Sequence, residues 1–145
     1  MFDPKVARLK TYEECESFAK NVQEKYPALA AQARRRGVEL RAAAHSANTD
    51  AEREALEAVY AVEEVMSHRN GKKTRASRTW QSFARHGILP AVERVVGRAK
   101  PTEGYAALLE MGLEDKTFEA VVLRHKELFQ PGTVERARSR IEGRG

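Results

Sequence analysis

The side chains of this chain that are best suited to chemistry are cationic, and they are concentrated in residues 71–100. This segment contains eight Lys or Arg residues and a single acid, Glu93, for a net charge of +7. Residues 1–70 and residues 101–145 each carry a net charge of −1, so the segment accounts for the positive charge of the whole chain. Because Lys and Arg form charge-assisted hydrogen bonds with phosphate oxygens, the segment predicts a surface that binds a polyanion.

A helix expected over residues 76–86 would sort part of this segment into two faces. At about 100° per residue, Trp80 and Phe83 fall on one side of the helix. Four polar side chains fall on the opposite side, namely Arg78, Gln81, Ser82 and Arg85. We therefore predict that Trp80 and Phe83 pack against a core. The polar face is then available for phosphates or base edges.

The next expected helix, over residues 88–98, has a similar division. Its apolar side leaves Arg94 and Arg98 exposed about one turn apart. Three more cations precede the helix at 76–86, near an N-terminus whose unpaired N–H groups favour an anion. The predicted nucleic-acid-binding residues are therefore Lys72, Lys73, Arg75, Arg78, Gln81, Ser82, Arg85, Arg94 and Arg98.

No arrangement of residues indicates catalysis or metal binding. Cys15 lies on an apolar helix stripe between two glutamates, and neighbouring negative charge disfavours the reactive thiolate. Glu64 and His68 share a helix face, but two ligands do not complete a metal shell. The chain has no glycine-rich phosphate loop. Paired acids such as Glu63 and Glu64 are expected on a charged helix face, and His86 is expected to complement the dipole at a helix end. We expect a non-enzymatic protein with no catalytic residue, no metal and no cofactor.

The elements that position the basic segment are all expected to be helices. The sequence predicts an all-α bundle of seven or eight short helices in a single domain, residues 1–145, with sub-halves of 1–68 and 71–142. The bundle begins with an antiparallel helical hairpin over 11–45, where small residues allow two helices to approach closely. One helix is expected over 115–129 and a last one over 133–142. No segment has the alternating pattern of a strand.

The remaining features of the sequence concern location and the chain end. One cysteine cannot form an internal disulfide, which is typical of a reducing compartment. No apolar stretch approaches the ~20 residues of a membrane-spanning helix, and no signal peptide is apparent. We therefore expect a cytoplasmic protein with no membrane association. Residues 141–144, IEGR, match a protease site used in expression vectors, so no function is assigned to 141–145.

The function predicted from these features is a small nucleic-acid-binding module that mainly contacts the phosphate backbone, with DNA favoured over RNA. A solvated helix face normally intersperses acids among its Lys and Arg residues, and the scarcity of acids in 71–100 argues against that simpler interpretation. An alternative is a helical adaptor or regulator whose basic face docks an acidic protein partner. The sequence leaves open both this alternative and the choice between a monomer and a homodimer.

Overall fold

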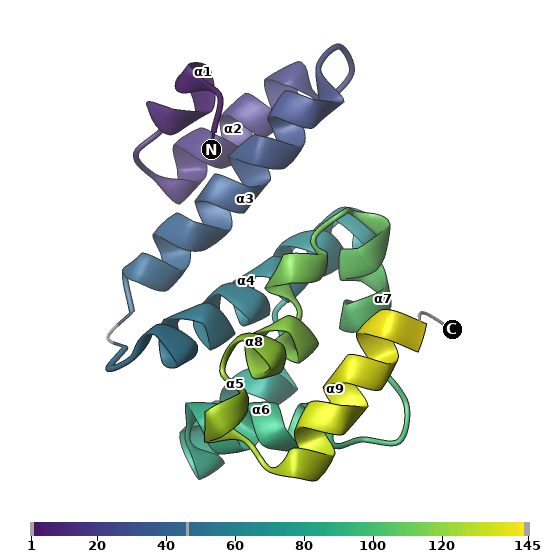
Figure 1. Cartoon of the computed structure of the whole chain (residues 1–145). Helices are drawn as coiled ribbons and strands as arrows, with labels where there is room; N and C mark the ends of the chain where they lie inside the picture. The colour runs from purple at the N-terminus through teal and green to yellow at the C-terminus, as the bar shows by residue number, and fades with distance from the viewer. Residues whose placement is uncertain (1, 46, 144–145) are drawn as a thin grey trace. The chain divides into compact units, whose positions relative to one another are not determined.

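The structure of the protein, a computed structural model, describes residues 2–45 and 47–143 and is entirely helical (Figure 1). These residues form nine α-helices and two short 3-10 helices, and none of them lies in a β-strand. The prediction of an all-α fold is confirmed. The chain divides into two compact units, residues 1–46 and residues 47–145. The expected single domain stays a prediction.

The first unit contains the predicted helical hairpin. Its helices are α1 (Pro4–Ala7), α2 (Tyr12–Val22) and α3 (Pro27–Ala43). Thr11 caps α2 by accepting a hydrogen bond from the Glu14 N–H. A Cβ atom added to Gly37 of α3 would lie 3.3 Å from Cβ of Cys15, so the missing side chain allows the close approach of the two helices. The hairpin is therefore confirmed, although the short α1 precedes it.

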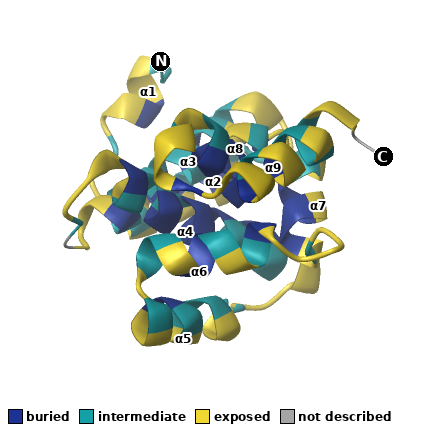
Figure 2. Ribbon diagram, turned by 60° about the horizontal axis from the view of Figure 1, so that its bottom comes forward, coloured by how far each residue is buried: buried dark blue, intermediate teal, exposed yellow. Residues whose placement is uncertain are grey.

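The second unit contains the basic segment. Its α-helices are α4 (Asp50–Asn70), α5 (Ser77–His86), α6 (Ile88–Val96), α7 (Glu103–Glu110), α8 (Phe118–Arg124) and α9 (Pro131–Gly143). The 3-10 helices are η1 (Glu114–Lys116) and η2 (Lys126–Leu128). Helix α4 packs against α6, α7 and α8. Its buried positions recur at helical spacing, among them Ala55, Leu56 and Val59. In Figure 2, α5 is mostly exposed or intermediate, because Phe83 is its only buried residue.

The single helix predicted over 115–129 is wrong, because Thr117 interrupts it. The backbone of Thr117 is extended, and its hydroxyl accepts a hydrogen bond from the Ala120 N–H at 3.0 Å. The same hydroxyl donates to the carbonyl oxygen of Glu114 at 2.9 Å. Thr117 therefore ends η1 and caps the start of α8, and a new 3-10 turn follows at His125.

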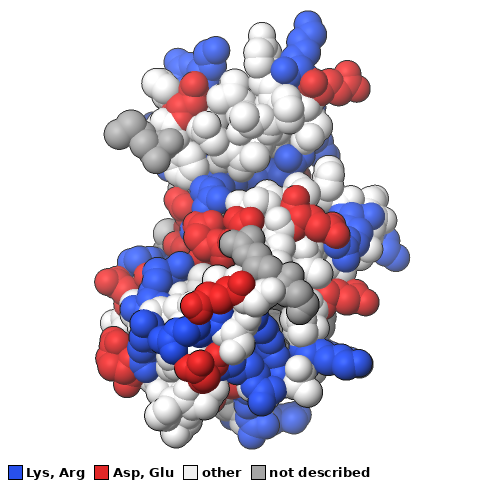
Figure 3. All heavy atoms as spheres, turned by 45° about the vertical axis from the view of Figure 1, so that its right-hand side comes forward, with Lys and Arg blue, Asp and Glu red and all other residues white. Residues whose placement is uncertain are grey.

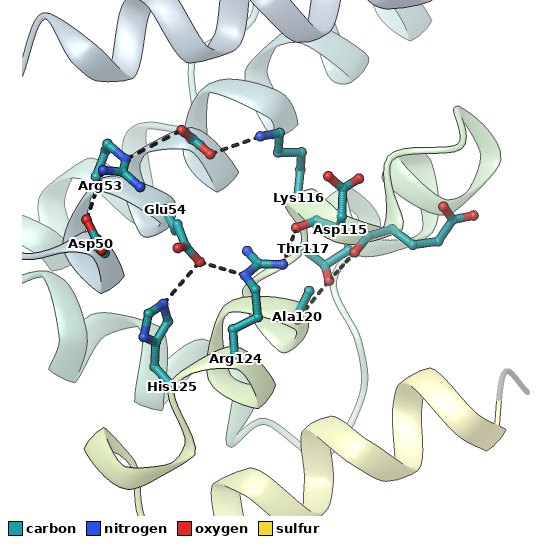
Figure 4. Close-up of polar contacts among 11 residues, drawn as sticks. Asp50, Arg53, Glu54, Asp115, Lys116, Thr117, Ala120, Arg124 and His125 are labelled. Atoms are coloured by element: carbon teal, nitrogen blue, oxygen red, sulfur yellow. Dashed lines mark hydrogen bonds and ion pairs between the residues drawn. The ribbon is translucent and has the colours of Figure 1, made fainter. Parts of the chain in front are cut away.

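A polar network ties α8 to the first half of α4 (Figure 4). The Glu54 carboxylate accepts a hydrogen bond from Nε of Arg124 at 2.6 Å and lies 3.1 Å from Nε2 of His125. Nearby, Nζ of Lys116 donates to the Glu57 carboxylate at 2.9 Å. Burial opposes the ionisation of Glu54, but the hydrogen bonds and charges of Arg124 and His125 outweigh it and lower the pKa of this carboxyl.

Two further findings concern the membrane and the chain end. Within residues 2–45 and 47–143, no helix combines the length and the apolar composition needed to span a membrane. Helix α9 extends from Pro131 to Gly143 and so includes part of the protease-site sequence. Residues 144 and 145 lie outside the described residues.

Candidate functional site

Helices α5 and α6 meet at a corner made by one residue, Gly87. Its backbone has φ +91° and ψ 162°, a conformation that is essentially restricted to glycine. The Gly87 N–H donates to the carbonyl of Phe83 at 2.9 Å, and the Gly87 carbonyl accepts from the Ala91 N–H at 3.1 Å. The last turn of one helix and the first turn of the next are therefore closed through this glycine. The corner fixes the two basic helix faces relative to each other.

A buried carboxylate anchors α5 to α4. Glu63 of α4 is 3% exposed, and one of its oxygens accepts hydrogen bonds from Nε1 of Trp80 at 2.7 Å and from the Ala76 N–H at 2.9 Å. The Trp80 ring also packs edge-on against the rings of Tyr60 and Phe83. These contacts agree with the predicted packing role of Trp80 and Phe83. The sequence interpretation of Glu63 as an acid on a charged outer face is wrong, because its carboxylate is buried.

The outer face of the α5–α6 corner borders a hollow of about 630 Å³, which we call the arginine hollow. Residues from α4 to α8 line it, and their side chains are mainly basic or hydroxylic around a few apolar contacts. The lining residues are Val62, Arg78, Thr79, Gln81, Ser82, Arg85, His86, Arg94, Val95, Gly97, Arg98, Thr102, Gly104 and Phe118. The hollow therefore unites residues that are up to 56 positions apart in the sequence, from Val62 to Phe118.

Six of the nine predicted site residues line the arginine hollow together. They are Arg78, Gln81, Ser82 and Arg85 from α5, with Arg94 and Arg98 from α6 and the turn after it. The other three are not among its lining residues. Lys72 and Lys73 are exposed in the loop before α5. The guanidinium carbon of Arg75 lies 5.8 Å from the centre of the Trp80 ring, in a cation–π contact.

Several lining residues were missed by the sequence interpretation. His86 was assigned a role only at the end of its helix, yet it lines the hollow in the last turn of α5. Thr79 lies three residues before Ser82 and was detectable from helical spacing alone. Thr102 caps the start of α7 and Phe118 is the first residue of α8, and no local pattern links them to α5. Gly104 also brings α7 close to α4, since a Cβ atom there would lie 2.9 Å from Cγ1 of Val62.

No acidic side chain lines the arginine hollow. Its four arginines form no ion pair with an acid among the described residues, in contrast to Arg53, Arg69, Arg124 and Arg138 elsewhere in this unit. Glu93, the one acid of the basic segment, instead accepts a hydrogen bond from the Gln130 N–H at 3.3 Å. Partial burial and the positive charges of Arg94 and Arg85 lower the pKa of His86. The hollow is therefore a region of positive potential.

Helix α9 supports one side of the hollow through the backbone of Arg98. The Arg98 carbonyl oxygen accepts hydrogen bonds from the guanidinium group of Arg136, at 2.9 Å, and from that of Arg140. Arg140 also pairs with Glu119 at 2.9 Å, and the two side chains are only 9% and 4% exposed. Burial raises the pKa of Glu119 despite the opposing hydrogen bond from Arg140. These contacts hold the turn after α6 in place.

The charge pattern of the hollow differs from that on other surfaces of the second unit. In the view of Figure 3, basic and acidic side chains lie beside one another on much of the visible surface. Within the described part of the chain, no group of three His, Cys, Asp or Glu residues is arranged to hold a metal ion.

Comparisons of the chain with models of protein families, with characterised proteins and with solved structures found no match.

Proposed function

We propose that this protein binds nucleic acid through the arginine hollow, with DNA as the favoured ligand. The observation that carries the proposal is the acid-free lining, in which Arg78, Arg85, Arg94 and Arg98 border the same hollow. Guanidinium groups bind phosphate oxygens through paired, charge-assisted hydrogen bonds. A surface with several such groups and no competing acid favours a ligand that carries several phosphates.

The placement of the arginines favours a binding role over simple solvation. A charged face that serves only solubility carries both signs and forms local ion pairs. Several arginines elsewhere in the second unit form such pairs, as Arg53 with Asp50 and Arg138 with Glu135 illustrate. Holding four unneutralised guanidiniums around one hollow is electrostatically unfavourable, and an anionic ligand relieves that repulsion.

The polar residues between the arginines support contacts with the nucleic-acid backbone above all. Ser82 and Thr79 offer hydroxyl groups for phosphate oxygens, and Gln81 offers an amide for a phosphate or a base edge. Lys72 and Lys73, which are exposed in the loop before α5, add electrostatic attraction for the phosphates at longer range. The proposed function is therefore binding without any reaction of the ligand. The sequence leads us to expect that this binding takes place in the cytoplasm.

The test is a fluorescence anisotropy titration of labelled duplex DNA, single-stranded DNA and RNA at about 50 and about 200 mM salt. The critical variant is Arg85→Gln/Arg94→Gln, which removes two charges from the hollow without enlarging the apolar core. Lys126→Gln is the control for loss of charge elsewhere, because it removes one exposed cation outside the hollow.

We expect the wild-type protein to bind in the micromolar range or tighter, with affinity that falls as salt rises. If Arg85 and Arg94 contact separate phosphates, the double variant should weaken binding and reduce the salt slope by roughly 0.9 per lost phosphate on duplex DNA. Absence of binding to all three nucleic acids at low salt would overturn the proposal. Equal losses of affinity in the double variant and in Lys126→Gln would indicate that the binding site lies outside the hollow.

A further inference from the structure

The arginine hollow is more than a basic surface, because apolar groups contribute to its lining. Val62, Val95 and Phe118 line it together with the arginines, and Phe118 is only 8% exposed. A site for continuous phosphate backbone needs cations but gains little from valine and phenylalanine. A ligand that combines charge with an apolar body matches both parts of the lining.

The size of the hollow also points to a defined ligand group. Its volume of about 630 Å³ lies within the roughly 300–1,000 Å³ that is typical of small-molecule sites. A nucleotide combines a charged phosphate with a sugar and a flat base, and such a unit suits a hollow of this size. The arginines would bind its phosphate, while the sugar or base contacts Val62, Val95 or Phe118.

Moving a nucleotide from the interior of a strand into such a hollow costs free energy. It is stacked on both sides, and moving it out of the stack requires a few kcal/mol for unstacking and unpairing. A terminal nucleotide has a stacking neighbour on one side only. If phosphorylated, its end also carries about −1.5 to −2 charges, more than the single charge of an internal phosphodiester. Four arginines with no acidic partner favour the more highly charged group.

From these observations we propose that the arginine hollow binds the phosphorylated terminal nucleotide of a nucleic-acid strand. Arg85 and Arg94, from the two helices that meet at Gly87, are the leading phosphate ligands. Ser82 adds a hydroxyl donor from α5, and the partly exposed Val62 and Val95 give the apolar contact. This inference rests on the proposed nucleic-acid binding and makes a narrower claim, namely that strand ends are preferred.

The experiment compares one labelled single strand in four forms: with a 5′-phosphate, with a 3′-phosphate, with hydroxyl groups at both ends, and closed into a circle. Titrations with wild-type protein and with the Arg85→Gln/Arg94→Gln and Lys126→Gln variants give the affinity for each form. Because a charged hydrogen bond gained at the end group changes affinity by about tenfold, one phosphorylated end should bind at least that much more tightly than the circle. The double variant should lose this preference, whereas Lys126→Gln should retain it.

The outcomes separate this inference from the function on which it rests. Tight, salt-dependent binding of all four forms with equal affinity would overturn the preference for ends and leave nucleic-acid binding intact. Failure of all four single-stranded forms to bind would overturn this inference, and only failure of duplex DNA and RNA as well would overturn nucleic-acid binding. Competition with a free nucleoside monophosphate distinguishes the source of the ligand: if the mononucleotide binds as tightly as the phosphorylated strand, the site is one for free nucleotides and the inference is wrong.

Discussion

Nε1 of Trp80 donates a hydrogen bond to the buried carboxylate of Glu63 at 2.7 Å, and the same carboxylate oxygen accepts from the Ala76 N–H at 2.9 Å. Glu63 of α4 thus holds both the start of α5 and Trp80, the aromatic residue in the first turn of α5. The basic face of α5 depends on this contact for its orientation, although Glu63 is not among the residues that line the arginine hollow.

Replacing Glu63 with alanine should therefore destabilise the second unit strongly. The change leaves two partly buried donors without their acceptor, and we expect a loss of about 2–4 kcal/mol in the free energy of unfolding. Urea unfolding followed by circular dichroism measures this loss. Glu110→Ala is the matched control, because the pair of Glu110 with Arg69 is exposed and contributes about 1 kcal/mol or less. Similar losses in the two variants would contradict the anchoring role of Glu63.

Gly87 should tolerate no side chain. Alanine at φ +91° and ψ 162° is strained, so Gly87→Ala should cost about 1–3 kcal/mol and weaken nucleic-acid binding by moving α5 against α6. Gly132→Ala is the control. Gly132 lies in α9 with open space around its Cα, and alanine there should leave stability unchanged or raise it by up to about 1 kcal/mol. Thermal unfolding of both variants tests the contrast, and an unaffected Gly87→Ala protein would refute it.

The pKa of His86 should respond to changes in the charge of the arginine hollow. Partial burial and the cations Arg94 and Arg85 hold its pKa below 6.5, so Arg94→Gln should raise this pKa by removing a repulsive charge. A bound oligonucleotide without terminal phosphates should raise it too, because the phosphates offset the arginines. Binding then takes up a proton, and affinity should increase as pH falls through the pKa of His86. NMR titration of the imidazole resonances follows both effects, and a pKa that is unchanged by ligand would place the phosphates elsewhere.

The Glu54–Arg124 pair should contribute to stability only when Glu54 is ionised. Because the folded-state pKa of Glu54 is lowered from 4.5, its contribution is present above pH 4.5 and is lost as pH falls through the lowered value. Arg124→Gln should therefore cost about 1 kcal/mol near neutral pH and progressively less in acid. Urea unfolding of wild type, Arg124→Gln and the exposed control Arg138→Gln from neutral to acidic pH gives the comparison. A loss in Arg124→Gln that stays constant with pH would assign it to contacts other than the Glu54 pair, such as the hydrogen bond from Arg124 to the Asp115 carbonyl at 2.9 Å.

Helical spacing was enough to predict the outer face of α5 because that face depends only on local geometry. Arg78 and Arg85 are seven residues apart, about two turns, so they share a side in any regular helix. The same reasoning could have found Glu63, since it lies four residues after Val59 on the buried stripe of α4. Its acidic side chain was instead assigned to the surface, where unpaired charges normally lie.

The other features of the site depend on contacts between distant parts of the chain. Phe118, which lines the hollow, is the first residue of α8, and Thr117 caps this helix where one continuous helix was expected. The hydrogen bonds from Arg136 and Arg140 to the Arg98 carbonyl join segments about 40 residues apart. Residue type and periodicity carry no signal for such contacts, so the sequence predicted the basic face but not the hollow that it borders.

The corner at Gly87 also restricts how this site could change during evolution. A substitution at Arg78, Arg85, Arg94 or Arg98 alters one contact and leaves the others in place. An insertion or deletion at the corner would change the direction in which α6 leaves α5, because the non-helical backbone of Gly87 sets that direction. The arginines of the two helices would then no longer border the same space. We therefore expect related proteins to vary in the side chains around the hollow while the number of residues between the two helices stays constant.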